Sequence, residues 1–254
     1  MKTAIITGAT SGIGRATAIR MARNGFRLIL TGRRKERLDA LKAELERDFQ
    51  AEVLLLNVDM RDQPAVSSVL EDLPASWQEI DVLVNNAGLA AGLEPINEGS
   101  LSDWEAMIDT NVKGVLYITK IISNWMIIRK SGHIINIGSI AGTQAYANGA
   151  VYCASKHAMH ALSQGMRIDL LPYNIKVSEI RPGMVDTEFS TVRFHGNTRR
   201  ADQVYQGVEP LTGDDIASII EWLTALPPHM NINDIEVMPT QQANAYYTFR
   251  KEEP

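Results

Sequence analysis

Short apolar runs alternate with longer amphipathic segments along almost the whole chain. The runs have the length of strands buried on both faces, and we expect strands at 3–7, 27–31, 53–58, 81–85, 133–137, 175–180 and 232–237. Between them, apolar residues recur every three or four positions, as at Leu38, Leu41 and Leu45, which is typical of amphipathic helices. We expect helices at 15–24, 35–49, 62–73, 101–129, 150–171 and 212–226.

The alternation of strand and helix predicts the fold class. Parallel strands need crossover connections, so this pattern indicates an α/β, Rossmann-type doubly wound sheet of about seven mostly parallel strands with helices on both faces. No Pro/Gly/Ser-rich linker divides the 254 residues, and a single domain, 1–254, is expected. The polar segment at about 183–207 is expected to form a loop or broken helices over the site, and we call it the lid. A C-terminal tail occupies about 240–254.

Composition limits the kinds of partner that the protein is expected to bind. The net charge of -5 argues against a nucleic-acid or anionic-membrane partner, and no run approaches the length of a membrane span. The lone cysteine, Cys153, excludes a disulfide within the chain and fits a reducing compartment. A cytoplasmic location is therefore expected.

Tyr152 and Lys156 stand four residues apart in an expected helix, one turn apart on one face. An ammonium about 4 Å from a phenol would lower the tyrosine pKa from about 10 toward neutrality, so the phenol could exchange a proton with an alcohol oxygen. Ser139 follows the strand at 133–137, at the sheet edge where open α/β sheets bind ligands, and could hold the substrate oxygen. Alone, such a Tyr–Lys pair is more often a packed ring beside a solvated ammonium.

A glycine-rich turn follows the first strand and precedes a helix. Glycines let the backbone approach a pyrophosphate, and the free N–H groups of the helix start face it. We expect a dinucleotide phosphate site made by Gly8, Thr10, Ser11, Gly12, Ile13 and Gly14.

The residues that follow the second strand indicate which dinucleotide is bound. Arg33 and Arg34 follow the second strand, where an NAD site places a carboxylate, and two guanidiniums suit the 2′-phosphate of NADP. NADP(H) is therefore the expected cofactor. After the third strand, Asp59 and Met60 are expected to contact the adenine. After the fourth strand, Asn86, Ala87 and Gly88 are expected to lie along the ribose and pyrophosphate side.

With these residues assembled, the chain resembles the short-chain dehydrogenase/reductase family over almost its whole length. The motifs are T-G-x-x-x-G-I-G at 7–14, N-N-A-G at 85–88, Y-x-x-x-K at 152–156 and P-G at 182–183. The resemblance implies that Tyr152 is the general acid/base, Ser139 the substrate-oxygen clamp and Lys156 both a tuner of Tyr152 and a ribose ligand. It implies that Asn111 holds a proton-relay water. It also implies a homotetramer packed through helices at 103–129 and 150–171, and cofactor contacts from Pro182, Gly183, Val185 and Thr187, the last at the nicotinamide carboxamide.

A narrower similarity points to a small anionic substrate. Segments 73–77, 85–90, 103–111, 187–196 and 229–239 resemble the NADP-dependent branch that oxidises serine, allo-threonine and 3-hydroxy acids or reduces malonic semialdehyde. They are also similar to sulfoacetaldehyde reductases, which form isethionate. The tail after Pro239 departs from the hydroxy-acid enzymes, so a carboxylate and a sulfonate both stay open.

Selection of an anion needs a cation near the reacting group, and Arg193 in the lid is the first candidate. Weaker candidates are His195, Arg199 and Arg200, and the tail could add hydrogen bonds from its own subunit or a neighbour's through Gln241, Gln242 and Tyr246.

Two other functions are compatible with the same fold: a reductase of carrier-bound 3-oxoacyl chains and a non-catalytic NADP-binding sensor. The net acidity argues against a docking surface for an acidic carrier, and a sensor does not need the Ser139, Tyr152, Lys156 and Asn111 set. No metal site is expected, because His157 and His160 have no third ligand at useful spacing.

Overall fold

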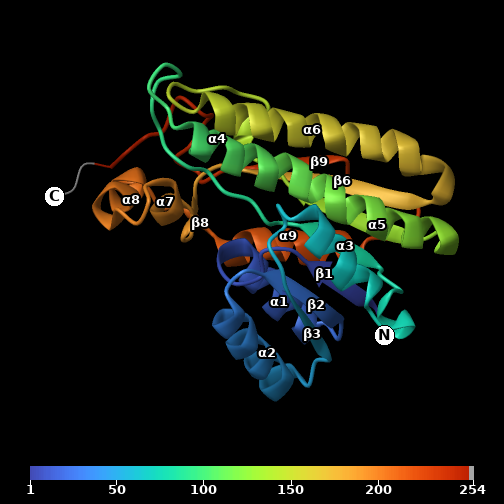
Figure 1. Ribbon diagram of the computed structural model, residues 1–254. Helices are drawn as coiled ribbons and strands as arrows, with labels where there is room; N and C mark the ends of the chain where they lie inside the picture. Colours follow the sequence, from blue (N-terminus) through green and yellow to red (C-terminus); the bar gives the residue numbers. More distant parts are fainter. Residues whose placement is uncertain (252–254) are drawn as a thin grey trace.

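A seven-stranded parallel sheet in the order β3-β2-β1-β4-β5-β6-β9 forms the centre of the computed structural model, which describes residues 1–251 (Figure 1). Its strands are β1 (Thr3–Ile6), β2 (Arg27–Gly32), β3 (Val53–Asn57), β4 (Val82–Asn85), β5 (Gly132–Ile137), β6 (Ile175–Pro182) and β9 (Asp234–Val237). The strand predictions are confirmed, with ends shifted by at most two residues. The order reverses between β1 and β4, and such a switch point opens a crevice at the carboxyl ends of the strands.

Helices cover both faces of the sheet, as the doubly wound prediction requires. One core contains side chains of α1 (Gly12–Arg23), α2 (Lys35–Phe49) and α9 (Gly213–Ala225). The opposite core contains side chains of α3 (Gln63–Glu71), α5 (Gly114–Arg129) and α6 (Ala150–Leu170). Successive side chains of one strand alternate between the faces, so Ile5 lies in the second core and Ile6 in the first.

The expected helix at 101–129 is confirmed, but it contains a π-helical turn. It consists of α4 (Leu101–Ile108), a π-helical turn (Asp109–Lys113) and α5. A π-turn adds a residue to the helix and often marks a functional site. Here it carries Asn111, whose side chain is buried. Single-turn 3-10 helices at Ala75–Trp77, Ile140–Gly142 and Leu171–Tyr173 complete the connections between the main elements.

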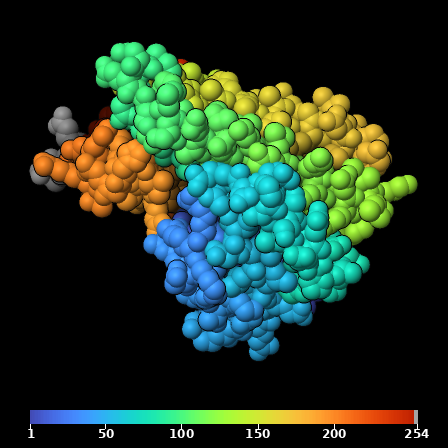
Figure 2. All heavy atoms as spheres, in the orientation of Figure 1, coloured from blue at the N-terminus to red at the C-terminus, as the bar shows by residue number. Residues whose placement is uncertain are grey.

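The lid contains broken helices, as expected, and a short strand that the sequence did not predict. Its elements are β7 (Val185–Asp186), α7 (Phe189–Arg193) and α8 (Thr198–Tyr205). β7 pairs with β8 (Leu211–Thr212) in a separate two-stranded parallel sheet, which ties both ends of the lid together. Strands of two residues are too short to leave a pattern in the sequence. Figure 2 shows the lid in orange at one end of the molecule, beside the green segment and the blue N-terminal part.

The tail folds back against its own chain. An isolated bridge joins Gln242 to Thr248, and the Ala245 N–H donates to Gln144 Oε1. At its end, the Lys251 N–H donates to the carbonyl oxygen of Gly207 at the end of the lid. The tail therefore connects the lid to the loop that precedes α6. The last part of the predicted tail, 252–254, lies outside the described residues.

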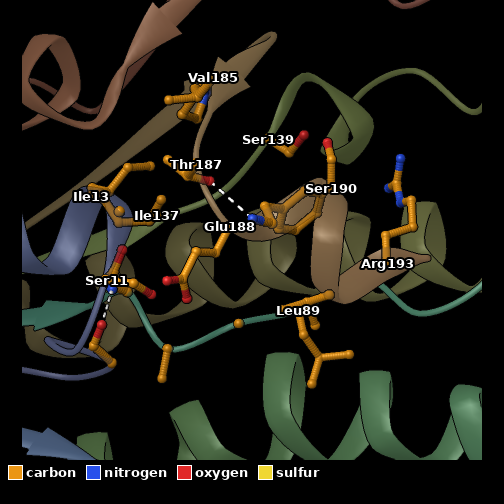
Figure 3. A pocket seen from close by; sticks show the side chains of 18 of the residues that line it. Ser11, Ile13, Leu89, Ile137, Ser139, Val185, Thr187, Glu188, Ser190 and Arg193 are labelled. Atoms are coloured by element: carbon orange, nitrogen blue, oxygen red, sulfur yellow. Dashed lines mark hydrogen bonds between the residues drawn. The ribbon is translucent and has the colours of Figure 1, made fainter. Parts of the chain in front are cut away.

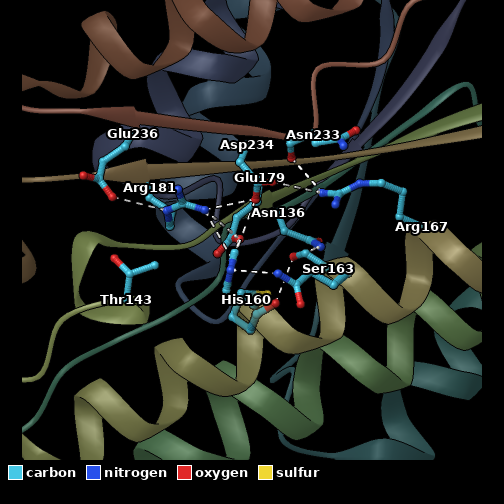
Figure 4. A network of polar contacts seen from close by, with 12 residues as sticks. Asn136, Thr143, His160, Ser163, Arg167, Glu179, Arg181, Asn233, Asp234 and Glu236 are labelled. Atoms are coloured by element: carbon cyan, nitrogen blue, oxygen red, sulfur yellow. Dashed lines mark hydrogen bonds and ion pairs between the residues drawn. The ribbon is translucent and has the colours of Figure 1, made fainter.

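An ion-pair network fastens the edge strand β9 to β6 and α6 (Figure 4). Glu179, which is fully buried, contacts His160, and Arg181 lies 3.0 Å from Asp234. The ligand atoms of His160, Glu179 and Asp234 all lie within 4.8 Å of one another, in a cluster that does not include His157 and that the sequence spacing does not indicate. The expected lack of a metal site stays a prediction. Arg181 already supplies positive charge to this cluster, 3.6 Å from Glu179. We therefore interpret it as a structural network.

Within residues 1–251, no helix combines the length and the apolarity needed to cross a bilayer.

Candidate active site

One large cavity lies at the carboxyl ends of the central strands, under the lid (Figure 3). Its volume of about 440 Å³ is within the range of roughly 300–1,000 Å³ that is usual for small-molecule sites. Most of the residues predicted from the sequence line it: Gly8, Thr10, Ser11, Gly12, Ile13, Arg33, Arg34, Asp59, Met60, Asn86, Ala87, Gly88, Ser139, Tyr152, Lys156, Pro182, Gly183, Val185, Thr187 and Arg193. Of the predicted catalytic and cofactor residues, Gly14 and Asn111 lie behind its wall.

The glycine turn has the backbone that a phosphate site needs. Gly8 and Gly12 have φ angles of +68° and +53°, which favour glycine, and a Cβ at Gly14 would collide with the Gly8 carbonyl. The Asn86 side chain donates to the carbonyls of Thr7, at 2.8 Å, and Gly8, at 3.2 Å, and so fixes the turn. The N-cap of α1 has no side-chain hydrogen bond, which leaves its first N–H groups for a ligand.

Arg33 and Arg34 both line this cavity. The Arg33 side chain is 57% exposed and lies 3.8 Å from the Asp59 carboxylate. Arg34 donates through Nη2 to Thr10 Oγ1, at 2.8 Å, and to Ser11 Oγ, at 2.9 Å. The guanidiniums are therefore placed beside the glycine turn, where a 2′-phosphate site is expected.

The fold brings Ser139, Tyr152 and Lys156 together, as predicted. Ser139 follows β5, and Tyr152 and Lys156 lie on the first two turns of α6 with 8% and 6% of their surface exposed. Ser139 and Tyr152 both line the cavity, and the Ser139 side chain acts on the pKa of Tyr152 in the lowering direction. Lys156 Nζ donates to the carbonyl of Ile137 at 2.9 Å. This arrangement can hold a carbonyl oxygen and deliver a proton to it.

The expected lowering of the Tyr152 pKa by Lys156 is wrong in this structure. Lys156 Nζ lies 6.0 Å from the centre of the Tyr152 ring, and burial raises the pKa of Tyr152 well above its ordinary value. The cation that acts in the lowering direction is Arg193. Burial also lowers the pKa of Lys156 to about 8. The i, i+4 spacing determines that both residues share one helix face. It does not determine the position of the ammonium group at the end of the long lysine side chain.

Arg193 lies over the Tyr152 ring. Its guanidinium carbon is 5.0 Å from the centre of the Tyr152 ring and 5.1 Å from that of Phe189. Nη2 donates to the Tyr146 hydroxyl at 2.9 Å, and the buried Nε has no hydrogen-bond partner among residues 1–251. In Figure 3, Arg193 lies at one end of the cavity and Ser11 at the other. A cation with a free donor thus faces the space beside the reacting groups.

The weaker anchor candidates lie outside the cavity lining. His195 Nε2 lies 3.0 Å from Asp103 Oδ2, and Arg200 stacks on Phe194 at 4.3 Å. Of the tail residues, Gln242 lines the cavity and accepts a hydrogen bond from the Met184 N–H. Arg199, Gln241 and Tyr246 are not among the lining residues.

Asn111 has its side chain fully occupied. It donates to the Leu89 carbonyl and to Ser155 Oγ, and it accepts from the Leu89 N–H. It therefore fixes the segment after β4 against α6, one residue from the cavity-lining Thr110. Its role as holder of a proton-relay water stays a prediction.

Sequence reasoning missed several lining residues, among them Tyr146 and Glu188. Tyr146 orients Arg193 from a loop 47 positions away, and Glu188 pairs with Arg34 across 154 positions. Neither has a local motif, so only the folded chain reveals these contacts.

Comparisons with known proteins indicate the family of the chain. The model of the family described as short chain dehydrogenase matches residues 2–197. The NADP-dependent 3-hydroxy acid dehydrogenase YdfG of Salmonella typhi is 47% identical over 242 residues, covering 95% of this chain and 96% of the relative. Serine 3-dehydrogenase of Rhizobium radiobacter is 44% identical over 250 residues, covering 98% of each chain.

A solved structure of serine dehydrogenase, the closed form complexed with NADP+, has a TM-score of 0.91 and 43% identity, covering 98% of this chain and 100% of that chain. The family model spans most of the chain, and the relatives span nearly all of it at more than 40% identity. The protein therefore belongs to the short-chain dehydrogenase family.

Proposed function

We propose that this enzyme transfers a hydride reversibly between NADP(H) and a small hydroxy acid or the corresponding aldehyde or ketone acid. The observation that carries the proposal is the position of Arg193, whose guanidinium carbon lies 5.0 Å from the Tyr152 ring centre in the cavity that Arg33 and Arg34 also line. One cavity thus offers cations at the adenosine end and at the reacting end. The names of the relatives, a 3-hydroxy acid dehydrogenase and a serine dehydrogenase, support the same substrate class.

The residues present fit a dinucleotide. The glycine turn and the start of α1 would hold the pyrophosphate, and Lys156 Nζ, which lies close to Gly88, would reach the ribose. Val185 and Thr187 would border the nicotinamide. When bound, NADPH supplies the hydride.

The chain's own groups handle the oxygen and the proton. Ser139 and Tyr152 line the same part of the cavity, so both hydroxyls can meet one carbonyl oxygen. Because burial raises the pKa of Tyr152, its phenol is protonated at neutral pH and can donate to the developing alkoxide. Arg193 would hold the carboxylate, or a sulfonate, of the same molecule.

A substrate panel tests this function. With NADPH we expect turnover of malonic semialdehyde or sulfoacetaldehyde, followed as loss of NADPH absorbance, and with NADP+ oxidation of 3-hydroxypropionate, serine or allo-threonine. Preference for a carrier-bound 3-oxoacyl chain over every free acid would favour the carrier-linked reductase instead. Binding of NADPH without turnover of any carbonyl compound would favour a sensor.

Replacing Arg33 and Arg34 together by Met should remove most of the preference for NADPH. Each charge-assisted contact with the 2′-phosphate contributes about 1.5–3 kcal/mol, so we expect the KM for NADPH to rise at least tenfold while that for NADH changes little. Steady-state kinetics with both cofactors measures this. If the double variant keeps its NADPH preference, another cation binds the 2′-phosphate.

We also propose a homotetramer. Apolar side chains are strongly exposed near the ends of α5 and α6, with Ile128 81%, Ile168 73% and Leu171 72% exposed, and packing between subunits would bury them. Light scattering should give about four times the chain mass of 28.1 kDa. A mass of one chain at working concentration would reject the proposal.

The unpaired, buried Cys153 fits a cytoplasmic location, which cell fractionation would test. Recovery of the enzyme in an oxidising compartment would contradict it.

A further inference from the structure

Glu188 reaches from the lid to the cofactor half of the site. It stands directly before α7, between Thr187 and Phe189, which both line the cavity. Its carboxylate accepts from Arg34 Nη1 at 2.7 Å and also from Arg37 Nη1. In Figure 3 this carboxylate points toward the Ser11 end of the cavity, away from Arg193. One lid residue is thus held by two arginines near the start of α2.

All three nitrogens of the Arg34 guanidinium already have partners. Nε donates to Thr10 Oγ1, Nη2 donates to Thr10 Oγ1 and Ser11 Oγ, and Nη1 donates to Glu188. The hydrogen bond with Arg34 holds the pKa of Glu188 below its ordinary value, so Glu188 is an anion at neutral pH. A phosphate that approaches this guanidinium therefore meets a carboxylate of like charge on the same donors.

We propose that Glu188 is a positioning residue that competes with the cofactor's 2′-phosphate for Arg34 while it anchors the lid on Arg34 and Arg37. The proposal rests on the assignment of Arg34 to the 2′-phosphate site. Arg37 does not line the cavity, so it can keep hold of Glu188 when Arg34 turns to the phosphate. The charge of Glu188 therefore has opposite effects on two affinities. It weakens the binding of NADPH and strengthens the binding of the substrate.

Glu188 can influence substrate binding because it stands directly before α7, the helix that carries Arg193. This helix spans the cavity, and its other end is held in the substrate half, where the Gly92 N–H donates to the Arg193 carbonyl at 2.9 Å. Phe189 and Arg193, which both pack on Tyr152, are the first and last residues of α7. Loss of the Glu188 anchor would therefore let Arg193 move relative to the reacting groups.

Glu188→Gln keeps the shape of the side chain and removes its charge. Glu188 and Arg34 are 42% and 40% exposed, so the effect should be that of a solvent-screened pair, about two- to fivefold. We expect the Kd of NADPH, measured by fluorescence titration, to fall by this factor while that of NADH stays constant. The KM for the aldehyde acid should rise by a similar factor. A purely structural role would change both cofactor affinities together, and an unchanged ratio of the two Kd values overturns the proposal.

Two variants isolate the effect. Arg37→Met removes one hold on the lid and leaves Glu188 on Arg34, so the KM for the aldehyde acid should rise without any gain in NADPH affinity over NADH. Glu44→Gln, on the outer side of α2 and paired with Arg15, removes a charge without touching the lid and should change neither quantity. An equal gain in NADPH affinity from Glu44→Gln would show a general charge effect and overturn the proposal.

A double-mutant cycle separates this proposal from the cofactor assignment. In the Arg34→Met background, Glu188→Gln should no longer alter the NADPH-to-NADH ratio. If Arg34→Met lowers the NADPH preference but Glu188→Gln leaves it unchanged in the wild-type background, only the Glu188 proposal fails. If Arg34→Met itself leaves the NADPH preference unchanged, both the assignment of Arg34 and the competition at it are overturned.

Discussion

Tyr152→Phe should lower kcat for carbonyl reduction by about 10²–10⁴-fold, the usual contribution of general acid catalysis, and leave the Kd of NADPH nearly unchanged. The substitution removes only the hydroxyl that we propose as the proton donor. The ring keeps its edge-to-face packing on Phe189, with centroids 5.6 Å apart, so the site should stay assembled. Steady-state kinetics and cofactor titration measure the two quantities separately.

Tyr146→Phe is the matched control, because it removes another phenol hydroxyl of the cavity. This hydroxyl accepts from Arg193 and is not bonded to Ser139, so reduction of a neutral aldehyde should be nearly normal. Turnover that survives in Tyr152→Phe, or is lost equally in both variants, would contradict the assigned proton donor.

The direction of the Tyr152 pKa shift also predicts how rate depends on pH. Burial raises this pKa, so at neutral pH the phenol is protonated and ready for reduction, whereas alcohol oxidation needs the phenolate. Oxidation should therefore accelerate as pH rises above neutrality. A pH profile of kcat/KM in both directions checks the sign.

Arg193→Met should lower kcat/KM for malonic semialdehyde or sulfoacetaldehyde by roughly tenfold to a hundredfold, equivalent to one charge-assisted contact of about 1.5–3 kcal/mol. The reason is the free Nε donor and the position of the guanidinium over the Tyr152 ring. A neutral aldehyde of similar size makes no such contact, and its kcat/KM should change little. Kinetics with a charged and a neutral aldehyde of matched size separates the two.

Arg200→Met provides the control within the lid. Arg200 stacks on Phe194 and does not line the cavity, so this variant should treat both aldehydes as the wild type does. Equal losses for the charged and the neutral substrate in Arg193→Met would mean that Arg193 supports the lid and that the anion binds elsewhere.

The sequence predicted the fold because its information is local. Buried parallel strands leave apolar runs, and the Leu38, Leu41 and Leu45 stripe of α2 is buried as its spacing requires. Tyr152, Lys156 and the glycine turn were found because each function needs residues at fixed short spacing. The π-turn at Asn111 left no such pattern, since one added residue only shifts the phase of the helical pattern and has no sequence motif of its own.

Contacts between distant segments could not be predicted. The hydrogen bond of Lys156 to Ile137 depends on how a flexible side chain crosses to β5. The expected pKa shift of Tyr152 is wrong because burial of the phenol in the folded chain raises this pKa. Likewise, the Glu188–Arg34 pair joins the lid to the start of α2 and exists only after the sheet has formed. Electrostatic tuning of a site is thus the part of function that sequence spacing determines least.

The central claim, hydride transfer from NADPH to a small acid, is tested most directly by isotope tracing. NADPH deuterated at the transferable C4 position of the nicotinamide is incubated with the enzyme and malonic semialdehyde, and the product is analysed by mass spectrometry. The account predicts one deuterium on the carbinol carbon of 3-hydroxypropionate with wild-type enzyme and almost none with Tyr152→Phe. Product without deuterium, or no hydroxy acid from any aldehyde acid supplied with NADPH, would contradict it.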